Sequence, residues 1–234
     1  KKNKKKWLFV SAYLGLLVLL KVVYVVVIPP FVILAIIDGR KDRCTFQNLV
    51  HGATFLLPSG LLIICMNWIR YGSIFESGYG SAQSDFSLLY LQRDWKDYLI
   101  SIDRGIITYS PIILLGIISF KKFFLTNSKT LFLIASICLT LYLLTASWIG
   151  WKGGYCWGNR NLVPIVPLLC LSWAFIDWKN LYQRITFLLL LIISFPIQIV
   201  AVSLKTHEWS VLSREFKDHP DPYYVPSELE GSVK

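Results

Sequence analysis

Charged residues are scarce in this sequence. Asp, Glu, Lys and Arg together make up 16% of its 234 residues, whereas an ordinary soluble domain carries about 25%. The apolar share is high, at 55%. This shortage of charge indicates a chain whose solvent is mostly lipid. Aromatic residues reach 15% and include nine Trp, a residue that concentrates where a membrane meets water.

The sequence also lacks the common signatures of metal sites and of soluble catalysts. Its three histidines are scattered, and its five cysteines show no close metal-type spacing. It contains neither a glycine-rich phosphate loop ending in Lys-Ser/Thr nor a nucleophile elbow. Only Cys156 falls clearly in a predicted outer loop, so no disulfide is expected. The sequence therefore predicts no metal site.

Apolar stretches follow one another along the chain, and a crossing helix needs about 20 apolar residues. The first stretch, residues 7–37, is interrupted by Lys21 and by Pro29-Pro30, and strongly basic segments flank it on both sides. Basic flanks prefer the cytoplasm, and a lysine at mid-membrane depth is costly. We therefore favour two short helices that meet near Lys21 at the outer interface over one long kinked helix. The other predicted spans are 49–69, 105–120, 130–149, 162–178 and 185–202.

The predicted fold is an all-α polytopic transmembrane helix bundle of about seven crossings. Residues 1–203 form the bundle, and residues 204–234 form a tail on the outer face. The inner segments hold thirteen of the 24 Lys and Arg residues but three of the 14 acids. Because basic loops stay inside, we expect a bacterial plasma-membrane protein with its N-terminus cytoplasmic and its C-terminus outside. Topology explains the net charge of +10, so no nucleic-acid partner is expected.

The first outer loop, residues 70–104, opens within a glycine-rich stretch, 67–80, that contains Glu76 and Tyr79. This stretch fits a sugar- or phosphate-facing loop or, more simply, a turn-rich exit from a helix. Arg104 closes the loop and either binds a lipid phosphate or snorkels to the interface. Between them, apolar residues at helical spacing predict an amphipathic helix in the interface plane: Leu88, Leu91, Trp95, Tyr98 and Ile102.

The second outer loop, residues 148–161, gathers three Trp, one Tyr, four Gly and two cations. Aromatic faces such as those of Trp151 and Trp157 can cover a sugar ring, and Lys152 and Arg160 can hold phosphate oxygens. Glycines allow backbone N–H groups to approach an anion. An interfacial belt explains the aromatic residues but not four glycines beside two cations. Substrate binding is therefore the favoured interpretation of this loop.

Four short motifs stand in a fixed order on the predicted outer face. They are a lysine between two short helices (14–37), Asn-Trp-x-Arg-Tyr-Gly-Ser with Phe-Glu-x-Gly-Tyr (67–79), Asp-Arg-Gly with Tyr-Ser-Pro (103–111), and Trp-Lys-Gly-Gly leading to Gly-Asn-Arg (151–160). With this set the chain resembles the C-terminal part of bacterial GT-C membrane glycosyltransferases of glycosyltransferase family 39. These are relatives of the protein O-mannosyltransferases and of the aminoarabinose lipid A transferase.

The resemblance implies that a sugar is transferred from a polyprenyl-phosphate donor on the outer membrane face to an acceptor, which the sequence leaves open. A general base activates the acceptor hydroxyl, and cations neutralise the leaving phosphate. Membrane lipid is the other expected partner. Whether a divalent cation serves as cofactor is left open by the sequence. The expected contacts to the donor phosphate are Arg160, Lys152, Arg104 and Lys21. The expected lining of the sugar or acceptor site is Glu76, Tyr79, Trp151 and Trp157.

In the family the catalytic acid lies in an outer loop near the N-terminus, and that loop has no counterpart here. We therefore expect this chain to be a fragment or truncated copy, and we assign no catalytic residue. Two other interpretations stay open: a transporter or flippase-like protein for a lipid-linked substrate, and a non-catalytic membrane subunit or remnant. Transporters bind near the midplane. Apart from Lys21, no ionisable residue sits well inside an apolar run, which argues against transport.

Overall fold

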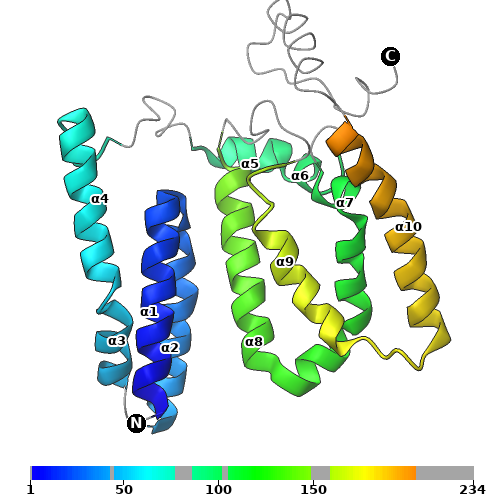
Figure 1. Ribbon diagram of the computed structural model, residues 1–234, viewed down its shortest axis with the longest axis horizontal. Coiled ribbons are helices and arrows are strands. Elements are labelled where there is room, and N and C mark those ends of the chain that lie inside the picture. The colour runs from blue at the N-terminus through cyan, green and yellow to red at the C-terminus, as the bar shows by residue number, and fades with distance from the viewer. Residues whose placement is uncertain (1, 43–44, 77–85, 102–104, 149–158, 204–234) are drawn as a thin grey trace, which may run out of the picture. The chain divides into compact units, whose positions relative to one another are not determined.

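The described part of the chain is built from helices (Figure 1). The computed structural model describes residues 2–42, 45–76, 86–101, 105–148 and 159–203, and no β-strand runs through these segments. The all-α class predicted from the sequence is thereby confirmed. The chain divides into two compact units. The first unit is Lys1–Ser84 with Ala135–Leu141, and the second is Asp85–Ile134 with Tyr142–Lys234.

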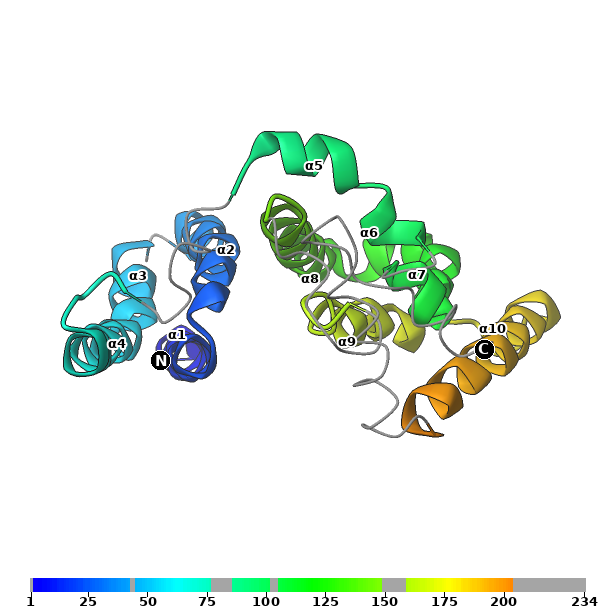
Figure 2. The same ribbon diagram turned by 90° about the horizontal axis from the view of Figure 1, so that it is seen from above.

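The first unit begins with a helical hairpin, whose two arms lie side by side in Figures 1 and 2. Lys21 leaves the helical conformation, with φ −155° and ψ 115°. The Nζ atom of Lys6 lies 2.6 Å from Oδ2 of Asp38, which ties the start of the first arm to the end of the second. The predicted pair of helices that meet at Lys21 is therefore confirmed. The elements are α1 (Lys2–Leu20), the 3-10 helix η1 (Val22–Val27) and α2 (Ile28–Asp42).

The two prolines of this hairpin do not break it. Pro29 and Pro30 lie in the first turn of α2, where a helix has no acceptor for the backbone N–H that proline lacks. The break therefore falls at Lys21 and not at the prolines.

Two further helices, α3 (Thr45–Ala53) and α4 (Leu56–Tyr71), complete the described part of the first unit. The helical conformation is interrupted between α3 and α4. There the N–H of Phe55 donates to Oγ of the fully buried Ser11 on α1, at 2.8 Å. One turn further along α1, a Cβ at Gly15 would lie 2.6 Å from Oγ of Ser59 on α4. Small residues four positions apart let membrane helices approach closely. Ser11 and Gly15 thus join α1 to α4.

Most of one long helix, α8, belongs to the second unit, and this helix turns back on itself. Asn127 leaves the helical conformation, with φ −150° and ψ 68°. Its side-chain oxygen accepts the N–H of Thr130 at 3.3 Å, as an N-cap residue does at the start of a helix. The elements are α5 (Leu88–Asp94), α6 (Asp97–Ile100), α7 (Ile106–Tyr109), η3 (Pro111–Leu114), α8 (Leu115–Ala146), α9 (Ile165–Cys170), η4 (Leu171–Phe175) and α10 (Leu181–Ser203).

The break between α7 and η3 is closed by α10, which lies beside it in Figure 1. Oγ of Ser194 accepts the N–H of Ile112 at 3.0 Å, and the amide of Gln198 donates to the carbonyl of Tyr109 at 2.8 Å. Ser194 and Gln198 are four residues apart and so share one face of the helix. At the other end of this unit, the rings of Phe123 and Phe175 stack with their centroids 4.3 Å apart, which joins α8 to η4.

Four of the described helices are long and apolar enough to cross a membrane, and a shorter apolar helix spans Ile165–Phe175. The chain is accordingly a membrane protein in its helical composition. The predicted number of about seven crossings is not reached by this count and stays a prediction. The four helices are Val22–Arg40, Thr45–Tyr71, Pro111–Ala146 and Leu181–Val200.

We expect Ser11→Ala to destabilise the first unit, because it leaves the N–H of Phe55 without its acceptor among packed helices. The loss should be about 1 kcal/mol in the free energy of unfolding. Thr186→Ala is the matched control, because the Thr186 hydroxyl donates to Tyr182 of its own helix at 2.9 Å. Reversible unfolding in mixed micelles measures both. An equal effect of the two substitutions would contradict the role of Ser11.

Candidate functional site

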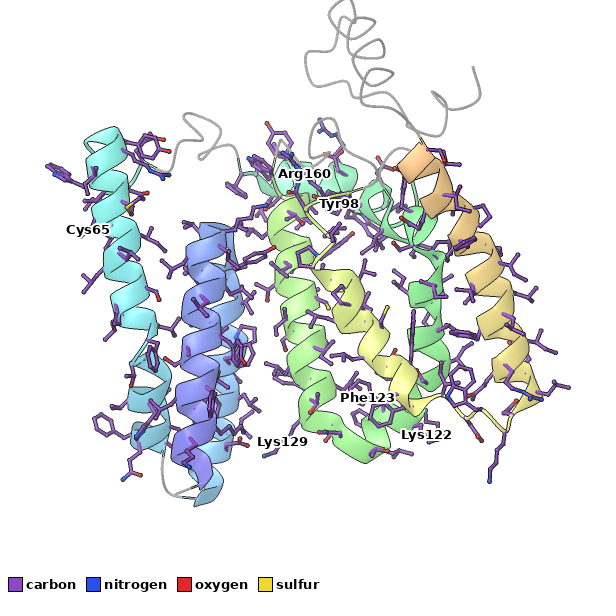
Figure 3. The ribbon with its side chains drawn as sticks, in the orientation of Figure 1. Cys65, Tyr98, Lys122, Phe123, Lys129 and Arg160 are labelled. Carbon is purple, nitrogen blue, oxygen red and sulfur yellow. The ribbon has the colours of Figure 1, made fainter. Side chains whose placement is uncertain are left out.

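A cluster of polar side chains lies at one end of the second unit. Figure 3 shows Tyr98 and Arg160 at this end and Lys122 and Lys129 at the opposite end, where α8 turns. Three segments meet at the cluster: α6, the last turn of α8, and the turn that follows Asn159. The start of α5 is attached to the same end. The N–H of Ser87 donates to the carbonyl of Ser147 at 2.8 Å.

Tyr98 is the centre of the cluster and is fully buried, with 0% of its surface exposed. Its hydroxyl shares hydrogen bonds with the side chains of Thr145, Asn159 and Asn161. Its ring meets the ring of Tyr142 edge to face, with centroids 5.7 Å apart. The hydroxyl of Tyr142 donates to the carbonyl of Trp95. Tyr98 therefore links α6 both to α8 and to the turn at 159–161.

The turn holds Arg160 between two anchored asparagines. Asn159 is 5% exposed, and its side-chain oxygen accepts the N–H of Asn161 at 3.1 Å. The carbonyl of Asn159 accepts the N–H of the fully buried Leu162 at 3.0 Å. The side chain of Arg160 is exposed. No hydrogen bond or ion pair joins it to another described residue. The turn thus presents one guanidinium on a firmly held backbone.

The buried carboxylate at this end is already neutralised. Asp94 is 4% exposed, and the guanidinium of Arg93 holds both of its oxygens, at 2.7 and 2.8 Å. Such a two-pronged pair uses one lone pair on each oxygen of Asp94. No group of three or more His, Cys, Asp or Glu in the described segments could hold a metal ion.

Burial raises the pKa of Tyr98 from 10.0 to about 12. The hydrogen bonds with Thr145, Asn159 and Asn161 act the other way and lower it, but burial outweighs them. Tyr98 is therefore neutral at physiological pH. It serves as a hydrogen-bonding anchor and not as a base.

The structure describes three of the eight site residues predicted from the sequence. Arg160 stands at the polar cluster. Lys21 is half-exposed and lies at the break between α1 and η1 in the first unit. Glu76 is half-exposed and follows α4, also in the first unit. The other predicted residues lie outside the described segments: Lys152, Arg104, Tyr79, Trp151 and Trp157.

The glycine-rich exit from α4 has a structural explanation. Gly72 adopts a left-handed conformation, φ 68°, which ends the helix with its N–H bonded to the carbonyl of Trp68. The side-chain amide of Asn67 donates to the carbonyl of Ile74 at 3.3 Å. These contacts agree with the simpler interpretation of this stretch, a turn-rich helix exit, for the residues up to Glu76.

The amphipathic helix predicted around Trp95 is split into α5 and α6. Leu88 is 73% exposed and Trp95 44% exposed, whereas Asp94 and Tyr98 are buried. Sequence reasoning placed Tyr98 on an apolar face and missed its role, along with Thr145, Asn159 and Asn161. The available signal was the pair of asparagines around Arg160, because amides beside an exposed cation require partners of their own.

No protein-family model matches the chain, and no curated protein or solved structure matches it at a significant level.

The raised pKa of Tyr98 predicts a loss of stability in alkali. The folded state keeps the phenol neutral up to about 12, whereas the unfolded chain releases the proton at 10.0. The stability that Tyr98 contributes is thus fully present below pH 10 and falls as the pH rises toward 12. The difference in unfolding free energy between wild type and Tyr98→Phe should be constant from pH 7 to 9 and shrink above 10. Unfolding in detergent measures it.

Tyr182→Phe is the control for this series, because the Tyr182 ring is 70% exposed. Its difference from wild type should show no such fall. A Tyr98→Phe difference that stays constant up to pH 12 would contradict the assigned pKa.

Proposed function

We propose that the chain is the donor-binding part of a membrane glycosyltransferase, which transfers a sugar from a polyprenyl-phosphate donor on the outer membrane face to an acceptor. One observation carries the proposal. An exposed guanidinium, Arg160, stands on a rigid turn beside a buried cluster of neutral hydroxyl and amide groups. A donor lipid would bring its phosphate to such a site from the membrane interface.

The chemistry of this site suits a leaving phosphate. A guanidinium offers a planar fork that can bond two phosphate oxygens at once. Charge grows on these oxygens as the sugar leaves, so a fixed cation stabilises the transition state more than the ground state. The buried carboxylate described at this end, Asp94, is held by Arg93 and so does not compete with the phosphate for Arg160. No described residue is assigned as the base that activates the acceptor.

The proposed topology retains about seven crossings, with the N-terminus in the cytoplasm. Two helical limbs flank Asn127: η3 with the start of α8 (residues 111–126) and the rest of α8 (residues 128–146). They measure about 24 and 28 Å at 1.5 Å per residue. Each nears the roughly 30 Å of a hydrocarbon core. Lys121, Lys122 and Lys129 flank the turn at Asn127 and favour the cytoplasm for it. Arg160 then faces the outside.

A transporter of lipid-linked substrates is the second candidate, and the broken helices favour it. Transporters line their sites with unwound backbone near the midplane. In this chain, however, the breaks at Phe55 and Ile112 are closed by Ser11 and Ser194. Backbone groups that are already bonded are not available to a substrate. The transferase is therefore the better supported of the two.

Arg160→Ala should weaken binding of polyprenyl phosphate to the purified chain in nanodiscs at least about tenfold, because it removes a charge-assisted pair of hydrogen bonds. Arg184→Ala is the matched control. Arg184 is also exposed, but it lies near the start of α10, on the cytoplasmic side of the proposed topology. Its removal should leave the affinity within about twofold. Native mass spectrometry of the lipid-bound chain measures both, and equal affinities for all three proteins would sink the proposal.

The transporter is separated from the transferase by a second assay. Vesicles that carry the chain are supplied with radiolabelled polyprenyl-phosphate sugars and an extract of acceptors. Loss of label from the lipid supports transfer. Movement of intact labelled lipid between leaflets without such loss supports transport.

The proposed topology predicts opposite labelling of two cysteines in a cysteine-free background. In intact cells, a membrane-impermeant maleimide should label Arg160→Cys and spare Lys122→Cys until the cells are opened. The reason is that the outer loop meets the medium whereas the turn of α8 meets the cytoplasm. Labelling of Lys122→Cys in intact cells would overturn the topology.

A further inference from the structure

We infer that Tyr98 is a positioning residue for Arg160, holding the guanidinium ready for the donor phosphate through the two asparagines on either side of it. This inference rests on the proposed function, because it assigns Arg160 a phosphate to bind. Tyr98 itself is fully buried, so its own surface is closed to the phosphate. Figure 3 shows its position next to Arg160.

The turn that carries Arg160 is arranged around one buried hydroxyl. The side chains of Asn159 and Asn161 both hydrogen-bond with the Tyr98 hydroxyl, so the residues before and after Arg160 are held by one atom. The bond from the Asn161 N–H to the Asn159 side chain closes the turn between them. With both neighbours directed inward, the side chain between them is directed to the surface.

The Tyr98 side chain is itself held on several sides. Tyr98 is 0% exposed, its ring is held against Tyr142, and its hydroxyl also bonds Thr145 on α8. A buried hydroxyl with partners on two other segments is costly to displace. The position of the turn relative to α8 is therefore set by Tyr98.

An ordered turn lowers the entropic cost of binding a phosphate. An arginine on a mobile loop must lose conformational freedom when it grips a phosphate, which weakens the complex. A turn that is already ordered avoids most of this loss, and a binding group must be held within about 0.5 Å to act well. The Tyr98 hydroxyl thus contributes to phosphate affinity without contacting the phosphate, and it does so only through Arg160.

A double-mutant cycle tests this dependence. Tyr98→Phe removes the hydroxyl and keeps the ring, and Asn161→Ala removes one of the two anchors from a half-buried position. Tyr142→Phe is the matched control, since it removes a hydroxyl from the same ring pair without touching the neighbours of Arg160. The affinity of each variant for polyprenyl phosphate and for polyprenol is measured in nanodiscs, with and without Arg160→Ala. Polyprenol lacks the phosphate and so reports on apolar binding alone.

The expected result is a loss of about three- to tenfold in phosphate affinity for Tyr98→Phe and for Asn161→Ala, and none for Tyr142→Phe. Polyprenol affinity should be unchanged. In the Arg160→Ala background, neither substitution should weaken phosphate binding further, because the group that they position is gone.

Two results would overturn the inference, and they are distinct. If Arg160→Ala weakens binding but Tyr98→Phe does not, or if the two losses are additive, Tyr98 does not act through Arg160 and the proposed function stands. If Arg160→Ala has no effect on phosphate binding, both the inference and the proposed function are wrong.

Discussion

The structure depends on a requirement that lipid imposes: every backbone N–H and C=O that a broken helix frees must find a partner inside the protein. Helices in the described part of the chain are interrupted at several points, and side chains of neighbouring helices hydrogen-bond the backbone groups exposed there. Ser11 of α1 accepts the freed N–H at Phe55, and Ser194 and Gln198 of α10 serve Ile112 and Tyr109. Each of these hydrogen bonds also decides which helices become neighbours, so backbone satisfaction and helix packing are set by the same few polar side chains.

The candidate site uses the same chemistry for a different purpose. At one end of the second unit, the polar groups that need partners are side chains. The buried hydroxyl of Tyr98 hydrogen-bonds with three of them, those of Thr145, Asn159 and Asn161. The result is a rigid turn that carries one cation. The proposed anion site needs such a neutral, ordered base under an exposed charge, and no described residue pairs with Arg160.

Much of the fold could be predicted from the sequence because lipid restricts the options. The scarcity of charge predicted the all-α class. The basic segments at both ends of the first apolar stretch, with Lys21 inside it, predicted the first hairpin. The partners at the breaks could not be predicted, since they lie 44 residues apart for Ser11 and Phe55 and 82 for Ile112 and Ser194. The site was found in part. Arg160 stood out by its charge, but Tyr98 looked like one more apolar position, because a helical spacing does not distinguish a ring that only packs from one whose hydroxyl is bonded.

The two ends of the second unit both carry cations, and the reasons differ. Lys121, Lys122 and Lys129 surround the turn of α8, and in the proposed orientation the insertion bias toward a basic cytoplasmic side accounts for them. In the proposed orientation Arg160 lies on the other side of the membrane, where that bias does not account for a cation. A local reason is needed there, and the buried network that holds the neighbours of Arg160 supplies one. A charge that served only solubility would not need both flanking residues tied to a buried hydroxyl.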